Sequence, residues 1–411
     1  MSRLSITPYF PFKRVKVVGQ NVHAQGALIR VQQDQRWRPL CHDCRSPARI
    51  VHSQGHRRMI RDMNLADRQV WLEVDYRKVW CERCGKTRVE HLDFCDSPER
   101  LTHRMRRCIY DLCKRMSVAD VAEHFGLDPK TITAVDKEFL QEEFGQTDYE
   151  GLRVLGMDEI AIKKGHQHFM TVILDYVSGR VVWTGEGRKK ETLDRFFDGM
   201  TPQQKNAIQA VAIDMWEAYI TSIQHHCPQA LIVFDLFHIV KGYGVVIDEV
   251  RRQEVSKAVG PMKQVVKGSR YLLLKNRDNL QPHQADRLDE LLKLNENLSR
   301  VYVLKDQLKV IYQYRRRDQA KAALDDWLAM AQRIDNYLMA HFIKTLRRFE
   351  YGILNHCDFP IGTSRLEGVN NKIKVIKRKA YGFHAPIYFG LKIKQAFPGH
   401  DKEPKTTNSL G

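Results

Sequence analysis

The sequence predicts a multidomain protein of mixed α+β / α/β class. Three observations lead to this fold class: two Cys-x-x-Cys pairs among strand-like stretches near the N-terminus, two short helical stretches that meet at a glycine, and a later alternation of strands and helices in which acids follow strands. A chain of 411 residues, 43% of them hydrophobic, can bury a substantial core, and at this length we expect two or three domains. Wholesale disorder is therefore excluded.

The chain is strongly basic, with 67 Lys and Arg against 49 Asp and Glu and a net charge of +18. Positive surfaces attract nucleic acid through counterion release, but ribosomal and membrane-surface proteins share this property. No apolar run approaches the roughly 18 residues needed to cross a bilayer, and the N-terminal residues lack the apolar stretch of a signal peptide. We therefore expect a soluble, cytoplasmic protein with no membrane partner.

Two cysteine pairs, Cys41 with Cys44 and Cys81 with Cys84, stand 36 residues apart. Two cysteines at this spacing reach one ion from a single tight turn, and four thiolates can close a tetrahedral zinc site with no open position. This pattern predicts one structural Zn²⁺ in a zinc-ribbon-like domain, with core or redox cysteines as the alternative. The other five cysteines are expected to be ordinary buried thiols.

Residues 104–140 are helical by pattern and contain helix-turn-helix signals. Ser117 can cap a first helix, Gly126 permits a sharp turn, and Asp128 with Pro129 can begin a second helix. Side chains in the first turn of such a second helix reach base edges or phosphates, so the candidate DNA contacts are Lys130, Thr131 and Thr133. The alternative is a helical hairpin that does not contact DNA.

From residue 153 the pattern changes to three successive strands, followed by helix, strand, helix, strand and helix. Ser178-Gly179 is a tight turn between the second and third strands, and Ala210-Val-Ala-Ile-Asp214 is a buried strand that ends on an acid. This order is that of a ribonuclease H-like fold, a mixed sheet with helices on its faces. In that arrangement the first and fourth strands are neighbours.

Asp158 and Asp214 would therefore converge, although 55 residues separate them. Two adjacent carboxylates repel each other unless they share a proton or bind a hard cation, and Mg²⁺ or Mn²⁺ uses such oxygen ligands. Taken singly, Asp214 could be a helix cap and Asp158 a turn acid. The pair together predicts a metal site.

A third acid, Glu367, lies in a basic helical stretch near the C-terminus. Ser364-x-x-Glu367 is a capping box, which could be the whole role of this glutamate. However, Glu367, Asn370, Asn371 and Lys374 fall three and four residues apart on one helical face, which suits a metal ligand followed by phosphate contacts. The alternative for the basic run is a solvated helix face.

A long, mostly helical stretch separates the second and third acids by 152 residues. Residues 251–350 are expected to include helices over Ala285–Leu298 and Ala320–Phe349, and they hold 21 basic and 12 acidic residues. Arg315, Arg316 and Arg317 form the densest basic cluster. This stretch is either a positive wall that holds DNA beside the acids or a packing domain with a charged surface.

The sequence resembles the bacterial insertion-sequence transposases of the ISL-three family over nearly its whole length. The resemblance is carried by the paired Cys-x-x-Cys and by Gly156-Met-Asp158-Glu, Ile213-Asp214-Met-Trp, Phe234-Asp235-Leu-Phe-His238 and Ser364-Arg-Leu-Glu367-Gly-Val-Asn-Asn-Lys-Ile-Lys. It implies a zinc-binding domain, a helix-turn-helix and a DDE catalytic domain of ribonuclease H-like fold with a helical insertion, whose catalytic triad falls on Asp158, Asp214 and Glu367.

These observations divide the chain into a zinc-binding domain (1–95), a helix-turn-helix domain (96–150), a ribonuclease H-like catalytic domain (151–250 and 351–398), a helical insertion (251–350) and a flexible tail (399–411). The hypothesis is DNA transposition, in which two Mg²⁺ or Mn²⁺ ions at the triad support strand cleavage and strand transfer. Further candidate DNA contacts are His238, Arg365, Asn370, Asn371, Lys372, Lys374 and Lys377; His238 could instead be a hydrogen-bonded core histidine.

The expected partner is double-stranded DNA, both the element's terminal inverted repeats and the target, bound by at least a dimer in the bacterial cytoplasm in association with the nucleoid. Two alternatives differ in class or substrate. One is a sequence-specific DNA-binding regulator in which the acidic domain is structural. The other is a structure-selective nuclease, which has less use for dedicated modules that read sequence.

Overall fold

The structure, a computed structural model, describes residues 7–23, 26–53, 57–96, 98–163, 168–361, 364–380, 382–383 and 385–399. The expected tail beyond residue 399 lies outside these ranges. The chain folds as two compact units, Met1–Gly145 and Gln146–Gly411. Among the helices in the described ranges, none is both long and apolar enough to span a lipid bilayer.

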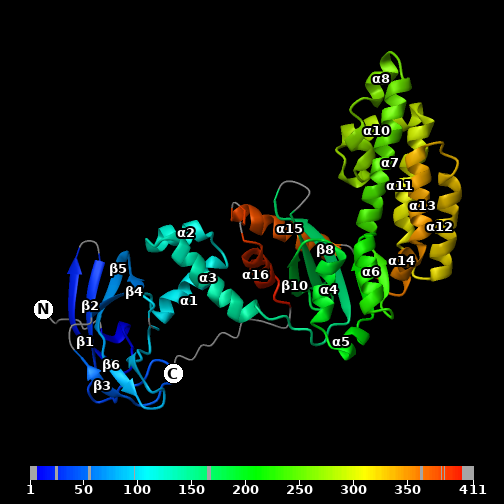
Figure 1. Ribbon diagram of the computed structural model, residues 1–411. Helices are drawn as coiled ribbons and strands as arrows, with labels where there is room; N and C mark the ends of the chain where they lie inside the picture. Colours follow the sequence, from blue (N-terminus) through cyan, green and yellow to red (C-terminus); the bar gives the residue numbers. More distant parts are fainter. Residues whose placement is uncertain are drawn as a thin grey trace. The chain divides into compact units, whose positions relative to one another are not determined.

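The first unit begins with a short 3-10 helix, η1 (Thr7–Tyr9), and two sheets (Figure 1). One sheet has the strand order β1-β2-β5-β4, with β2 and β5 parallel and the outer pairs antiparallel. The other has the order β3-β6-β7 and is antiparallel. The bounds are β1 (Val15–His23), β2 (Gly26–Gln33), β3 (Arg49–His52), β4 (Arg57–Leu65), β5 (Arg68–Asp75), β6 (Lys78–Cys81) and β7 (Lys86–Val89).

Three helices follow, α1 (His103–Cys113), α2 (Val118–Phe125) and α3 (Pro129–Phe144). Ser117 and Asp120 form a capping box at the start of α2, and Gly126 ends that helix in the left-handed conformation, at φ 63°. Asp128 caps α3, and Pro129 occupies its first turn. These contacts confirm the caps and the turn that the sequence predicts.

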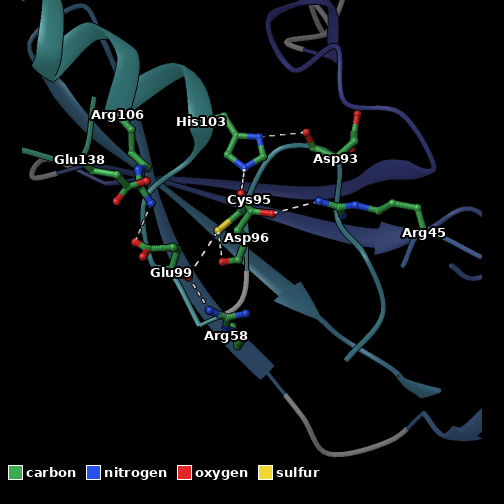
Figure 2. Close-up of polar contacts among 9 residues, drawn as sticks. All are labelled: Arg45, Arg58, Asp93, Cys95, Asp96, Glu99, His103, Arg106 and Glu138. Atoms are coloured by element: carbon green, nitrogen blue, oxygen red, sulfur yellow. Dashed lines mark hydrogen bonds and ion pairs between the residues drawn. The ribbon is translucent and has the colours of Figure 1, made fainter. Parts of the chain in front are cut away.

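A polar network joins the segment between the sheets and the helices to both (Figure 2). Asp96 accepts a hydrogen bond from His103, at the start of α1, at 2.8 Å, and forms an ion pair with Arg45 at 3.4 Å. Arg106 of α1 pairs with Glu99 at 3.0 Å and with Glu138 of α3 at 2.5 Å. The helices are therefore fixed to the sheets within one unit.

The second unit is built around a sheet with the strand order β10-β9-β8-β11-β12. β8, β9 and β10 pair antiparallel, whereas β11 pairs parallel with both β8 and β12. The predicted adjacency of the first and fourth strands is thus confirmed. The bounds are β8 (Val154–Ala161), β9 (Phe169–Asp175), β10 (Val181–Glu186), β11 (Ala210–Ile213) and β12 (Leu231–Phe234).

Helices cover both faces of this sheet. α4 (Lys190–Asp198) and α6 (Glu217–His226) pack on the face that carries Leu155, Met157 and Ile213, and the short α5 (Pro202–Asn206) follows α4. α15 (Ser364–Lys379) and α16 (Pro386–Ala396) pack on the other face through two apolar stripes. The alternation of side chains along each strand decides which residues meet which helices.

A long helix, α7, runs from the end of β12 into a bundle of helices (Figure 1). It continues through residues 250 and 251, where the sequence predicts a domain boundary. The elements are α7 (Leu236–Lys257), α8 (Pro261–Val266), α9 (Arg270–Leu274), η2 (Arg277–Asn279), α10 (Pro282–Leu294), α11 (Glu296–Ile311), α12 (Arg317–Ala331), α13 (Tyr337–Arg348), α14 (Glu350–Leu354) and η3 (Asn355–Cys357). We call α8 to α13 the helical part.

Two helices expected in the helical part were wrong in extent. The stretch Ala285–Leu298 breaks at Asn295, which ends α10 and caps α11 with its side chain. The stretch Ala320–Phe349 breaks before Asn336, which caps α13. In both cases asparagine competes for backbone hydrogen bonds and begins a new helix.

The helical part shares one apolar core with the sheet. Trp327 is 1% exposed, and its ring packs against Tyr243 of α7 at 5.4 Å between centroids. The Nε1 of Trp327 donates to the Leu304 carbonyl at 2.7 Å, and the Tyr243 hydroxyl donates to the Val301 carbonyl at 3.1 Å. These contacts belong to the same cluster of buried residues as the α4 and α6 face of the sheet.

Gly156 of β8 lies directly under α15. A Cβ at this position would stand 2.9 Å from the Cδ2 of Leu366. We expect Gly156→Val to lower the free energy of unfolding by about 1 to 3 kcal/mol, because extra methyl groups force α15 away from β8. Denaturant unfolding of the full chain measures this effect.

Leu366→Ala provides the control for that substitution. If the two residues press on each other, Gly156→Val costs less free energy of unfolding in the Leu366→Ala background than in the native chain. Strict additivity of the two changes would contradict the contact.

Candidate active site and cysteine centre

Three acids stand at one level of three adjacent parallel strands. Ala212 of β11 pairs with Gly156 of β8 on one side and with Val233 of β12 on the other. Two residues beyond this level, the same register places three acids side by side. They are Asp158 in β8, Asp214 directly after β11 and Asp235 directly after β12. Because side chains alternate along a strand, these acids share the face on which α15 lies. Asp235 is the member of this row that the sequence analysis did not assign to the metal site.

Asp158 is held from two directions. Its Oδ1 accepts a hydrogen bond from the Glu159 backbone N–H at 2.7 Å, and its Oδ2 accepts one from the Nδ2 of Asn370 on α15. Burial raises the pKa of Asp158, and the nearby Asp214 adds to the shift, while Asn370 opposes it. Asn370 is thus the one residue of the predicted face of α15 for which a contact with Asp158 is given among the described residues.

His238, in the first turn of α7, lies between two of the acids. Its Nδ1 is 3.0 Å from Oδ1 of Asp214 and 3.7 Å from Oδ2 of Asp235. The nearer contact is an ion pair that falls outside hydrogen-bond geometry. Burial opposes the charge on the ring, but the two carboxylates raise the pKa of His238 to about 10.

Glu159 is a fourth acid near the row, on the opposite side of β8. One of its oxygens is buried with no hydrogen-bond partner, and the other lies 3.5 Å from a guanidinium nitrogen of Arg188. Burial raises the pKa of Glu159, and so do Asp158 and Asp214. Glu159 was not among the residues predicted for the site, although the two adjacent acids Asp158 and Glu159 are a visible signal in the sequence.

Glu367 lies on α15 one turn before Asn370, and its side chain is exposed. Among the described residues, the four cysteines are the one group of three or more His, Cys, Asp and Glu whose ligand atoms all lie within 4.8 Å of one another. The carboxylates of Asp158, Asp214 and Glu367 are therefore not closed into such a group. The side chain of Ser364, the other half of the predicted capping box, lies outside the described residues.

Three of the predicted DNA contacts on α15 donate to carbonyls of the chain itself. Arg365 donates to the Val177 carbonyl at 3.2 Å and also to that of Tyr176, Lys372 to Ala396 at 2.6 Å, and Lys377 to Ala161 at 2.9 Å. These three side chains fix α15 to the β9–β10 turn, α16 and β8. Asn371 and Lys374 are exposed on the same helix.

The four paired cysteines converge in the first unit. Sγ of Cys44 lies 3.4 Å from that of Cys81, and Sγ of Cys41 lies 4.0 Å from that of Cys84. Tetrahedral zinc with Zn–S bonds of about 2.3 Å requires S–S separations of about 3.8 Å, so the arrangement fits this ion. Hydrogen bonds from Ser46 lower the pKa of Cys44 to about 6, whereas Cys44 raises the pKa of Cys84 to about 12.

Both cysteine turns have the same geometry. The backbone N–H of Arg45 donates to the Cys41 carbonyl at 3.0 Å, and that of Gly85 donates to the Cys81 carbonyl at 2.9 Å. Arg45 and Gly85 both adopt positive φ, at 58° and 64°. The two turns thus present their thiols in the same way.

The start of α3 is open to solvent. Lys130 is exposed, while Thr131 and Thr133 are half-buried. The Thr133 hydroxyl donates to the Pro129 carbonyl at 2.8 Å, which leaves its oxygen free to accept. The predicted contacts therefore share one helix end.

Comparison with known proteins shows the family of the chain. Residues 155–393 match a family described as "Transposase", and residues 90–140 match the "Helix-turn-helix domain of transposase family ISL3". The chain is 42% identical to the transposase for insertion sequence element IS1001 of Bordetella parapertussis, over 88% of this chain and 89% of that protein. It is 27% identical to the transposase for insertion sequence element IS1557 of Mycobacterium tuberculosis, over 80% and 79% of the two chains. The chain with this acidic row and this helix-turn-helix therefore belongs to transposase family ISL3 and is a DNA-cleaving and DNA-joining enzyme of transposition.

Proposed function

We propose that the second unit is a ribonuclease H-like catalytic domain whose triad is Asp158, Asp214 and Glu367, with the helical part as an insertion in it. The observation that carries the proposal is the strand register, which puts Asp158 and Asp214 side by side and opposite α15. Glu367 lies on that helix with an exposed side chain, three residues before the Asn370 that donates to Asp158.

The residues of this site fit divalent cations. Carboxylate oxygens are the ligands that Mg²⁺ and Mn²⁺ prefer, and burial of Asp158 and Glu159 in a group of acids costs free energy unless positive charge compensates. Two such ions, when bound, would activate an attacking oxygen and stabilise in-line displacement at phosphorus.

The chain's own residues would orient the DNA strand at this site. Asn370 holds the Asp158 carboxylate, which leaves Asn371 and Lys374 on the exposed side of α15 to contact phosphates. The same site would serve two steps. Water first cleaves the element's ends, and the freed 3′-hydroxyl then attacks target DNA, with no covalent enzyme intermediate.

The first unit would recognise the element's ends. Its four cysteines would hold one structural Zn²⁺, and α3 would present Lys130, Thr131 and Thr133 to the DNA. Transposition joins two ends, so at least two copies of the chain would assemble on DNA. The relatives are named as transposases for insertion sequence elements, which supports the ends of such an element as the DNA that is bound.

The triad can be tested by isosteric substitution. We expect Asp158→Asn, Asp214→Asn and Glu367→Gln each to reduce metal-dependent strand cleavage to background, because an amide cannot replace a charged ligand, while binding of the element's ends survives. Cleavage of a labelled duplex and a gel-shift assay measure the two properties. Asp289→Asn, which removes an exposed acid paired with Arg277, is the matched control. Cleavage retained by any one triad variant would remove that residue from the site.

The cysteine centre can be tested by zinc content. Cys41→Ser or Cys81→Ser should lower zinc per chain and weaken end binding, because the turn that holds Arg45 against Asp96 is lost. Elemental analysis and a binding titration report the two effects. Cys108→Ser, a cysteine of α1 outside the cluster, should leave zinc content unchanged. Equal zinc in all these proteins would contradict the assignment.

The helix-turn-helix can be tested by salt dependence. If Lys130 contacts a phosphate, Lys130→Ala weakens end binding and lowers the slope of log affinity against log salt by about 1. Lys114→Ala, which removes a lysine paired with Asp111 at 2.8 Å, serves as the control. An unchanged slope in Lys130→Ala would exclude this contact.

A further inference from the structure

His238 lies between the carboxylates of Asp235 and Asp214, which differ in burial and in their hydrogen bonds. The side chain of Asp235 is 8% exposed, and its Oδ1 accepts the Phe237 backbone N–H at 2.6 Å as the cap of α7. The side chain of Asp214 is 29% exposed and follows the last residue of β11. The imidazole, 19% exposed, lies between the fixed acid and the open one.

The backbone also holds this arrangement in place. The Asp235 backbone N–H donates to the Ile213 carbonyl at 3.1 Å, so the residue before Asp214 is tied to the residue that caps α7. The Tyr312 hydroxyl donates to the Phe234 carbonyl at 3.2 Å, which adds support from the helical part. The first turn of α7 therefore sets the position of His238 relative to Asp235, and the backbone of Asp235 is itself held by β11.

Asp158 and Asp214, the two aspartates of the proposed triad, each have a side-chain nitrogen next to one carboxylate oxygen. Asp158 receives a nitrogen donor from Asn370 on one of its oxygens, and Asp214 faces the Nδ1 nitrogen of His238 with one of its oxygens. Oδ1 of Asp158 also accepts the Glu159 backbone N–H, so both of its oxygens are oriented, whereas Asp214 faces His238 through Oδ1 alone. Groups that hold a ligating carboxylate orient it and tune its affinity.

From this geometry we propose that His238 is the positioning residue for Asp214, and that Asp235 is the anchor that holds the His238 ring. The proposal rests on the function proposed above, since it requires Asp214 to be a cation ligand. His238 then fixes the plane of the Asp214 carboxylate, because Nδ1 of His238 contacts Oδ1 of Asp214. The second oxygen is thereby presented toward Asp158.

Metal binding without DNA tests this role directly. Mn²⁺ affinity of the full chain is measured by electron paramagnetic resonance of free Mn²⁺. His238→Ala is expected to weaken Mn²⁺ binding by about 10- to 100-fold, the usual effect of losing a group that orients a ligand. His238→Asn keeps a side-chain nitrogen close to the position of Nδ1, where it faces Asp214, and is expected to restore affinity to within a few-fold of the native chain.

A second variant tests the anchor. Asp235→Asn keeps a side-chain oxygen that caps α7, so the helix start is preserved. The substitution replaces the negative charge that faces the His238 ring by a neutral amide. Mn²⁺ affinity is therefore expected to fall, as in His238→Ala. Circular dichroism and gel-shift assays on the element's ends should match the native chain in all three variants.

The outcomes separate this inference from the proposed function. Native Mn²⁺ affinity in His238→Ala, together with loss of cleavage in Asp214→Asn, would overturn the role of His238 and leave the triad standing. An equal loss in His238→Asn and His238→Ala would also overturn it, because a nitrogen that faces Asp214 would then not be what orients that carboxylate. Native Mn²⁺ affinity and native cleavage in Asp214→Asn would overturn the triad itself.

Discussion

The parallel register of β8, β11 and β12 is the constraint on which the second unit depends. Ala212 pairs with Gly156 and with Val233, so the residues two steps further on stand in a row at the carboxyl ends of the strands. A slip of one residue would turn each acid to the opposite face of the sheet, away from α15. Gly156 serves the same arrangement, since its lack of a side chain lets Leu366 and α15 approach β8 closely.

Both proposed ion sites collect negative charge, but they differ in access. The cysteine group has two thiols at residues that are fully buried, Cys41 and Cys81, and four thiolates leave no open position around a tetrahedral ion. In the acidic row, the Asp214 side chain is half-buried, and Glu367 on the neighbouring α15 is exposed. A closed site suits a structural ion, whereas an open one can exchange water for a phosphate oxygen.

The helix caps and the turn of the first unit could be predicted from local sequence signals, whereas the long-range contacts of the second unit could not. Ser117, Gly126 and Asp128 act on backbone within a few residues, so the sequence alone indicates the turn and both helix starts. Asn295 and Asn336 also act locally, but hydrophobic periodicity on either side hides them, and two helices were expected to be longer than they are. The bonds of Lys372 and Lys377 join residues 24 and 216 positions apart, and no local pattern contains that information.

Several basic side chains near the C-terminus bind carbonyl groups of the chain itself, so fewer of them are free to contact DNA. The stretch 363–396 holds eight basic residues and one acid, which in sequence suggests a continuous positive track. In the structure, Arg365, Lys372 and Lys377 donate to carbonyls of the chain, and they hold α15 in place.

The same holds in the helical part, where Arg316 pairs with Asp318 and Arg317 with Asp358. Arg317 also donates to Asn355 at 3.1 Å, and Asn355 in turn donates to the Ile232 carbonyl of β12 at 2.8 Å. This chain of contacts fixes the point at which the polypeptide returns from the helical part toward α15. Part of the positive charge between Asp214 and Glu367 thus stabilises the fold of the chain itself, at η3 and the end of β12.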